Sequence, residues 1–177
     1  MYYLKSNYMK KIIFVTLGLL LSAFVSIAAH RNVGAKDIIS SISEYKDVPG
    51  VEVISIGKLG LGLAKGVANL SAESEEEKAI LAILNGVNKL VVISYEDAAL
   101  ATQNELNSKL SKLLDNAEKI LEFKDEEDTI NIYGTSVNGG ESIDDLMIFI
   151  PEDYTLICAL GSIKTERIAD LIKIANE

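Results

Sequence analysis

The chain has 177 residues, of which 49% are hydrophobic and 24% are charged, a composition typical of one folded domain rather than a disordered or fibrous chain. Its 26 acidic residues outnumber its 17 lysines and arginines, so the formal net charge is -9. Because this charge repels phosphate backbones and anionic lipid headgroups, nucleic-acid binding and anionic lipid binding are disfavoured.

The first 28 residues have the pattern of an export signal. Lys10 and Lys11 precede the apolar run 12–27, and Ser26-Ile27-Ala28 is a small-x-small cleavage motif. We expect a signal peptide over residues 1–28 and a single α+β domain over residues 29–177. Cleavage removes three lysines and no acid, which leaves 14 basic and 26 acidic residues and a net charge of -12. A membrane contact is expected only if this segment stays uncleaved.

The first half of the mature chain predicts three helices and two strands. Pro49-Gly50 breaks the chain after the first helix, and Ser74 with Glu77 forms a capping box for the third. The second strand is nearly continuously apolar, so we expect it to be central in the sheet. In chain order these elements are a short amphipathic helix over residues 33–45, a strand over 51–56, a helix through 57–70, a helix from Ser74 and a strand over 90–94.

The second half predicts one long helix followed by an antiparallel meander. The acidic run 125–128 is expected to end the long helix, and Asn138-Gly139-Gly140 is expected to form a turn. The elements are a helix over residues 100–121, strands over 129–133, 146–150 and 155–160, and a closing helix with Ile168, Leu171, Ile172 and Ala175. This order predicts an α+β fold with helices packed on a mixed sheet of about five strands, a C-terminal antiparallel meander and a closing helix.

Two stretches carry a family pattern. The tail "DYTLICALGSIKTERIADLIK" has an acid and an aromatic residue, an apolar strand, a Gly-x-Ile step and an amphipathic helix, and "SISEYKDVPGVEVISIGK" has a helix, a glycine and a strand. The sequence resembles the exported Bacteroidota family catalogued as domain of unknown function 4252, from about residue 35 to the end. The resemblance implies an envelope location, a loose association with operons of extracytoplasmic-function sigma factors and the same α+β layout, but no established catalytic residues. The chain departs from the family in its glycine density over residues 57–66 and in lacking a lipoprotein cysteine.

The stretch "GKLGLGLAKG", residues 57–66, admits two interpretations. Its spaced glycines approach the fingerprint of a dinucleotide-binding loop, which needs glycines at a strand-to-helix turn and a ribose-binding acid about 20 residues further on. That position falls in the apolar residues 80–84, and the chain ends in a meander rather than in alternating strands and helices. We therefore predict a helix that packs closely on its neighbours, because glycine destabilises a helix unless close packing compensates. The glycines should face a close neighbour, and the buried residues should be Leu59, Leu63 and Val67.

Few residues suit catalysis. His30 is the sole histidine and lies at the extreme mature N-terminus, which disfavours Ser-His and Cys-His pairs and histidine-rich zinc sites. Cys158 lies in an apolar stretch and is expected to be an inert core residue. Thr129 follows Asp128 in a pattern that is similar to bacterial O-glycosylation sites. The acids form a predicted helix cap and two predicted solvated loops, namely Glu73 with Glu75, Glu76 and Glu77; Asp125 to Asp128; and Glu141 with Asp144 and Asp145.

These features favour an exported, non-catalytic envelope protein that binds or senses an envelope partner or ligand. We assign no catalytic, cofactor-binding or metal-binding residue and expect no cofactor. Two alternatives stay open, a carboxylate-based hydrolase or lyase and a structural or oligomeric envelope component. An exposed apolar patch would indicate a binding protein, two buried acids with perturbed pKa values in a pocket would indicate an enzyme, and a broad apolar face would indicate oligomerisation.

Overall fold

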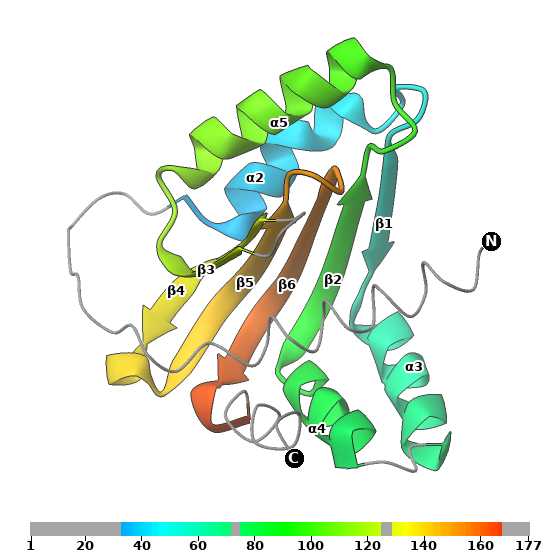
Figure 1. Cartoon of the computed structure of the whole chain (residues 1–177). Coiled ribbons are helices and arrows are strands. Elements are labelled where there is room, and N and C mark those ends of the chain that lie inside the picture. Colours follow the sequence, from blue (N-terminus) through cyan, green and yellow to red (C-terminus); the bar gives the residue numbers. More distant parts are fainter. Residues whose placement is uncertain (1–32, 72–74, 125–128, 168–177) are drawn as a thin grey trace.

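The centre of the molecule is a six-stranded sheet (Figure 1). The computed structural model describes residues 33–71, 75–124 and 129–167. Neighbouring strands are antiparallel throughout, in the order β1-β2-β6-β5-β4-β3, so β1 and β3 are the two edges. The strands are β1 (Glu52–Ile56), β2 (Val87–Ser94), β3 (Lys119–Lys124), β4 (Thr129–Val137), β5 (Ser142–Ile150) and β6 (Thr155–Lys164).

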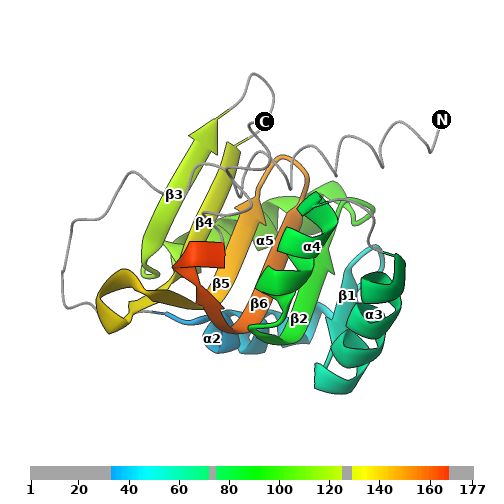
Figure 2. The ribbon, with the colours of Figure 1, turned by 90° about the horizontal axis from the view of Figure 1, so that it is seen from below.

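The helices form two groups at different parts of the sheet. One group lies side by side at the upper end of Figure 1 and comprises α2 (Ala35–Ile42) and α5 (Leu100–Leu114). The other group lies at the opposite end, toward the β1 edge (Figures 1 and 2), and comprises α3 (Lys58–Ser71) and α4 (Glu75–Leu84). α3 contacts β1, β2 and α4, whereas α4 contacts β6. Two 3-10 turns complete the described elements, namely η1 (Ser43–Tyr45) and η2 (Asn138–Gly140).

Side chains alternate between the two faces of each strand, so the sheet carries two apolar clusters. On one face, Ile93 and Phe149 are buried in a cluster with Leu106 of α5. On the other face, Ile163 is buried in a second cluster with Leu61 of α3. Each such side chain stabilises the fold by about 1.5–3 kcal/mol relative to the exposed side chain. Leu61 thus packs helix α3 against the sheet as part of the second cluster.

Most of the expected elements are confirmed, together with the α+β class and the C-terminal meander. The helix expected over residues 33–45 is α2 with η1, and the strand expected over 51–56 is β1. The strand expected over 90–94 is part of β2, which pairs on both sides and is therefore central, as predicted. The meander consists of β4, β5 and β6, and Asn138 begins the turn that joins the first two of these strands.

The long helix differs from the prediction. It was expected over residues 100–121, but α5 ends at Leu114 and residues 119–124 form β3. The N–H of Ala117 donates to the carbonyl of Leu114, only three residues back, and this tighter turn ends the helix. Ile120 and Leu121 then pack against the second cluster as strand residues. The sheet consequently has six antiparallel strands, where a mixed sheet of about five was expected.

Several expectations lie outside the described residues. They concern the signal peptide over residues 1–28, His30, the cap at Ser74, the acidic run 125–128 and the part of the closing helix beyond residue 167. Residues 165–167 are helical. Across the described ranges, no helix has the length and apolar character needed to cross a membrane.

Candidate functional site

The glycine-rich stretch is a helix and not a phosphate-binding loop. A single residue, Gly57, separates the end of β1 from the start of α3 at Lys58. The carbonyl of Gly57 accepts a hydrogen bond from the N–H of Leu61 at 2.9 Å, which closes the first helical turn. The spaced glycines therefore lie within helical turns rather than in an open turn that could surround a pyrophosphate. The helical interpretation of residues 57–66 is confirmed.

The predicted orientation of this helix is wrong. Leu59 and Leu63 were expected to be buried, but their side chains are 87% and 75% exposed, whereas Leu61 is only 5% exposed. A Cβ atom placed on Gly62 or Gly66 would meet nothing within 4 Å, so these two glycines do not face a close neighbour, whereas a Cβ on Gly60 would lie 3.0 Å from Ile56 Cγ2, so Gly60 does. The side chain of the third predicted core residue, Val67, lies outside the described set.

The connection to β1 explains the orientation of α3. Because one residue joins the strand to the helix, the end of β1 determines which side of α3 meets the sheet. Leu61 enters the second cluster on that side. Lys65, one turn later, donates through Nζ to the carbonyl oxygen of Val87 at 3.4 Å. Leu59 and Leu63 lie on the opposite side of the helix by their spacing, so they face outward.

Strand β1 also carries exposed apolar side chains. Ile54 is 52% exposed and Val53 is 39% exposed, although both belong to the sheet. Ile54 lies opposite Val92 of β2, and Ile56, two residues further on, packs against the second cluster. Alternation therefore places Ile54 on the face of the sheet that carries α3. We call the combination of β1, Gly57 and the outward side of α3 the β1–α3 edge.

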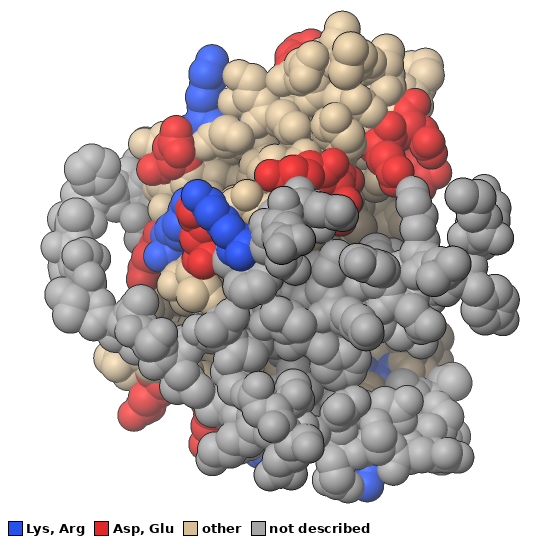
Figure 3. All heavy atoms as spheres, viewed as in Figure 1, with Lys and Arg blue, Asp and Glu red and all other residues tan. Residues whose placement is uncertain are grey.

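The opposite edge of the sheet is charged. Glu122 of β3 forms ion pairs with Lys119 at 2.7 Å and Lys124 at 2.9 Å. Hydrogen bonds from these two ammonium groups lower the pKa of Glu122 to about 2, so the carboxylate stays ionised. Figure 3 shows basic and acidic side chains gathered together over this part of the sheet. Charged side chains on an edge strand oppose pairing with another strand, and β1 lacks such a cluster.

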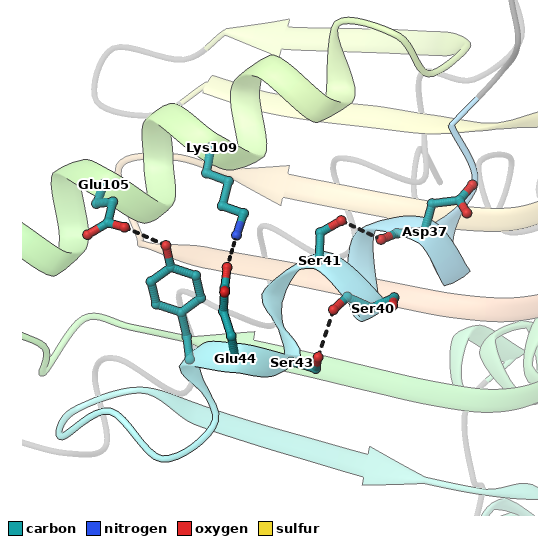
Figure 4. Close-up of polar contacts among 8 residues, drawn as sticks. Asp37, Ser40, Ser41, Ser43, Glu44, Glu105 and Lys109 are labelled. Carbon is teal, nitrogen blue, oxygen red and sulfur yellow. Dashed lines mark hydrogen bonds and ion pairs between the residues drawn. The ribbon is translucent and has the colours of Figure 1, made fainter.

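A polar cluster that sequence patterns did not predict joins η1 to α5 (Figure 4). The hydroxyl of Tyr45 donates to Glu105 Oε1 at 2.5 Å, and the Lys109 ammonium pairs with Glu44. Lys109 Nζ also lies 4.8 Å from the centre of the Tyr45 ring, within the range of a cation–π contact. The hydrogen bond to Glu105 raises the pKa of Tyr45 to about 12. This cluster fixes the first helical segment on α5.

The remaining predicted groups lie apart from the β1–α3 edge. Cys158 is a buried core residue, as predicted, and burial raises the pKa of its thiol to about 12. Asp144 and Asp145 were expected in a solvated loop, but they lie within β5 because the strand begins at Ser142. Asp145 Oδ1 accepts the N–H of Gly161 at 3.1 Å. Asp144 Oδ1 is buried without a hydrogen-bond partner in the described part of the chain.

A hollow of about 390 Å³ lies between α4 and β6. Asn85, Ser162, Lys164 and Arg167 supply its polar lining. Glu166 lies 3.7 Å from the ammonium of Lys164 and 3.8 Å from the guanidinium of Arg167, so it offsets part of this positive charge. Within the described ranges, no three His, Cys, Asp or Glu side chains are grouped to hold a metal ion. This hollow does not bring two acids together.

The fold and the β1–α3 edge define a class of protein, a single-sheet α+β domain with one charged edge and one apolar edge. Residues 45–171 match the family described as Domain of unknown function (DUF4252), and this match includes all six strands. The chain belongs to the DUF4252 family. No curated protein and no solved structure matches it.

Proposed function

We propose that the protein is an exported, non-catalytic binding protein of the cell envelope that associates with a protein partner through the β1–α3 edge. One observation carries this proposal. Ile54, Leu59 and Leu63 are large apolar side chains, and all three are exposed within ten residues of each other, at the junction of an edge strand and a helix. Exposed apolar surface of this kind marks sites of protein association.

The charges of α3 support the same proposal. In residues 58–71 the only charged residues are Lys58 and Lys65, and Lys65 is turned toward β2. A surface helix ordinarily carries polar residues on the side away from the core. The outward side of α3 instead offers leucines and glycines in a molecule that is strongly acidic overall. Burial of this apolar side against a partner is therefore more favourable than its exposure to water.

Burial of the three apolar side chains alone does not provide enough free energy for stable association. Full burial of a leucine or isoleucine contributes about 1.5–3 kcal/mol, so three of them contribute roughly 5–9 kcal/mol. Association costs on the order of 4–15 kcal/mol in lost freedom of motion. Backbone hydrogen bonds to the side of β1 that faces away from β2 supply further affinity when a partner adds a strand there. The proposed partner therefore presents an extended segment together with an apolar surface.

Export is supported by the signal pattern over residues 1–28 and by the envelope location that the family resemblance implies. For the hydrolase or lyase alternative, the expected sign is a carboxylic acid held protonated in a pocket. The carboxylate with a shifted pKa among the described residues is Glu122, and its pKa is lowered rather than raised. An ionised Glu122 is therefore the opposite of the protonated acid that this alternative requires.

Site-specific photo-crosslinking in the native host tests the proposal. A photoreactive amino acid replaces Leu63 in one strain and Leu100, a 68% exposed leucine at the start of α5, in a control strain. We expect an adduct from position 63 that is absent from position 100, and we expect Ile54→Arg to abolish it. Mass spectrometry identifies the partner. If positions 63 and 100 give the same adducts, or neither gives one, the proposed docking edge is wrong.

A further inference from the structure

We infer that the partner at the β1–α3 edge is a second copy of the same chain, bound by antiparallel pairing of the two β1 strands across a two-fold axis. This inference rests on the proposed function and specifies its partner. Antiparallel pairing is self-complementary, because each strand offers the other the same alternating N–H and C=O groups. Among the described residues, strand β1 pairs only with β2, so its alternate backbone groups point away from the described sheet.

The difference between the two edges selects β1 for this pairing. In β3, Lys119, Glu122 and Lys124 occupy half of the six positions and form ion pairs with one another. In β1, Glu52 is the only charged residue of five, and the other four are Val, Ile, Ser and Ile. Charged side chains on an edge discourage strand addition, whereas an apolar edge permits it. A molecule with a net charge of -9 also repels its copy least where neither surface carries an acidic cluster.

The charges at the ends of β1 fit one register. If Ile54 pairs with Ile54 of the second copy, Glu52 lies opposite Ile56 and Val53 lies opposite Ser55. The two Glu52 carboxylates are then at opposite ends of the paired strands. Each Glu52 approaches the end of the partner strand, where Lys58 begins α3. Both residues are exposed, so two complementary Glu52–Lys58 pairs form across the axis.

The size of the edge suits a small dimer. Five strand residues span about 17 Å, and the 14 residues of α3 span about 21 Å. Specific interfaces bury about 800 Å² on each partner and the weaker ones bury about 600 Å² or less. With a width of about 10 Å for each element, strand and helix together offer roughly 400 Å², which is below this lower value and corresponds to a weak, concentration-dependent dimer. Leu59 and Leu63 extend the contact beyond the strands.

Sedimentation velocity over a wide range of protein concentration tests the inference, with the chain expressed from its full sequence and purified as the cell processes it. We expect a reversible dimer. Ile54→Arg should raise the dissociation constant at least tenfold, whereas the matched control Leu100→Arg should leave it unchanged. Circular dichroism verifies that both variants remain folded. A monomer at every concentration, or an Ile54→Arg variant that dimerises as the wild type does, overturns the inference.

Charge reversal provides a second test that does not alter the apolar side chains. Glu52→Lys and Lys58→Glu should each weaken the dimer, and the double variant should restore it to within a few-fold of the wild type. Additive weakening in the double variant overturns the proposed register. The crosslinking experiment separates the two proposals. If position 63 captures a different protein while the chain sediments as a monomer, the second-copy inference fails and the docking function stands.

Discussion

A matched pair of leucine substitutions in α3 measures which side of the helix faces the core. Leu61→Ala removes a side chain that belongs to the second apolar cluster, whereas Leu63→Ala removes an exposed one. A buried leucine-to-alanine change costs about 2–5 kcal/mol, and the lower half of that range applies because α3 lies at the edge of the sheet and can relax. We therefore expect Leu61→Ala to lower the free energy of unfolding by about 2–3 kcal/mol.

The exposed partner of the pair should behave differently. About a quarter of the Leu63 side chain is covered, which corresponds to about 0.5 kcal/mol of apolar burial. The slightly better helix propensity of alanine offsets part of this loss. At low protein concentration we therefore expect Leu63→Ala to change the free energy of unfolding by less than about 0.5 kcal/mol.

Urea denaturation at two protein concentrations checks both values and relates them to dimerisation. A partner present at 100 times its dissociation constant stabilises the folded chain by about 2.7 kcal/mol, so the wild type should become more stable as its concentration rises. Leu61→Ala should retain that rise and Leu63→Ala should lose part of it. Equal destabilisation by the two substitutions at low concentration would show that this orientation of α3 is incorrect.

Three further outcomes follow from described contacts. Gly50 has φ +81° and a Cβ there collides with the Asp97 backbone, so Gly50→Ala should lower the free energy of unfolding by about 1–3 kcal/mol in urea denaturation. An unchanged midpoint contradicts this close approach. The pKa of Tyr45, raised to about 12, should return toward 10.0 in Glu105→Ala when phenolate absorbance is titrated. Because the raised pKa favours the neutral phenol in the folded state, its stabilisation is complete below pH 10.0 and disappears as the pH rises to about 12. Cys158 should react with an aromatic disulfide reagent only after unfolding, since burial raises its pKa to about 12, and rapid reaction of the native protein contradicts its burial.

Sequence periodicity predicted the elements that have one clear polar side. In α2, Ile38 and Ile42 are buried at helical spacing, as expected, and the polar residues Lys36, Asp37 and Ser40 are exposed. In α3 the pattern predicted the helix but not its orientation. Nearly every position there is apolar or glycine, so periodicity cannot distinguish the Leu59–Leu63 side from the Leu61 side. The single-residue link to β1 made that choice.

The error at residues 119–124 has a different origin. Ile120 and Leu121 continue the helical spacing of α5, so the local pattern is compatible with either state. The choice of strand depends on β4, which pairs with these residues only after the chain has folded back. The contact between Tyr45 and Glu105 was also beyond local patterns, because the two residues are 60 positions apart in the chain. Tertiary pairing determined both features.

The two edges of the sheet together explain how a dimer remains closed. If both edges accepted strands, each added copy would expose a new edge and the assembly would grow without limit. The ion pairs of Glu122 with Lys119 and Lys124 oppose growth at β3. Pairing through β1 then uses the one apolar edge of each copy and leaves charged edges at both ends of the joined sheet. Replacing Lys119, Glu122 and Lys124 by neutral residues should therefore yield assemblies larger than a dimer in sedimentation velocity. Adding Ile54→Arg to this variant blocks pairing through β1, so these larger assemblies should then be lost.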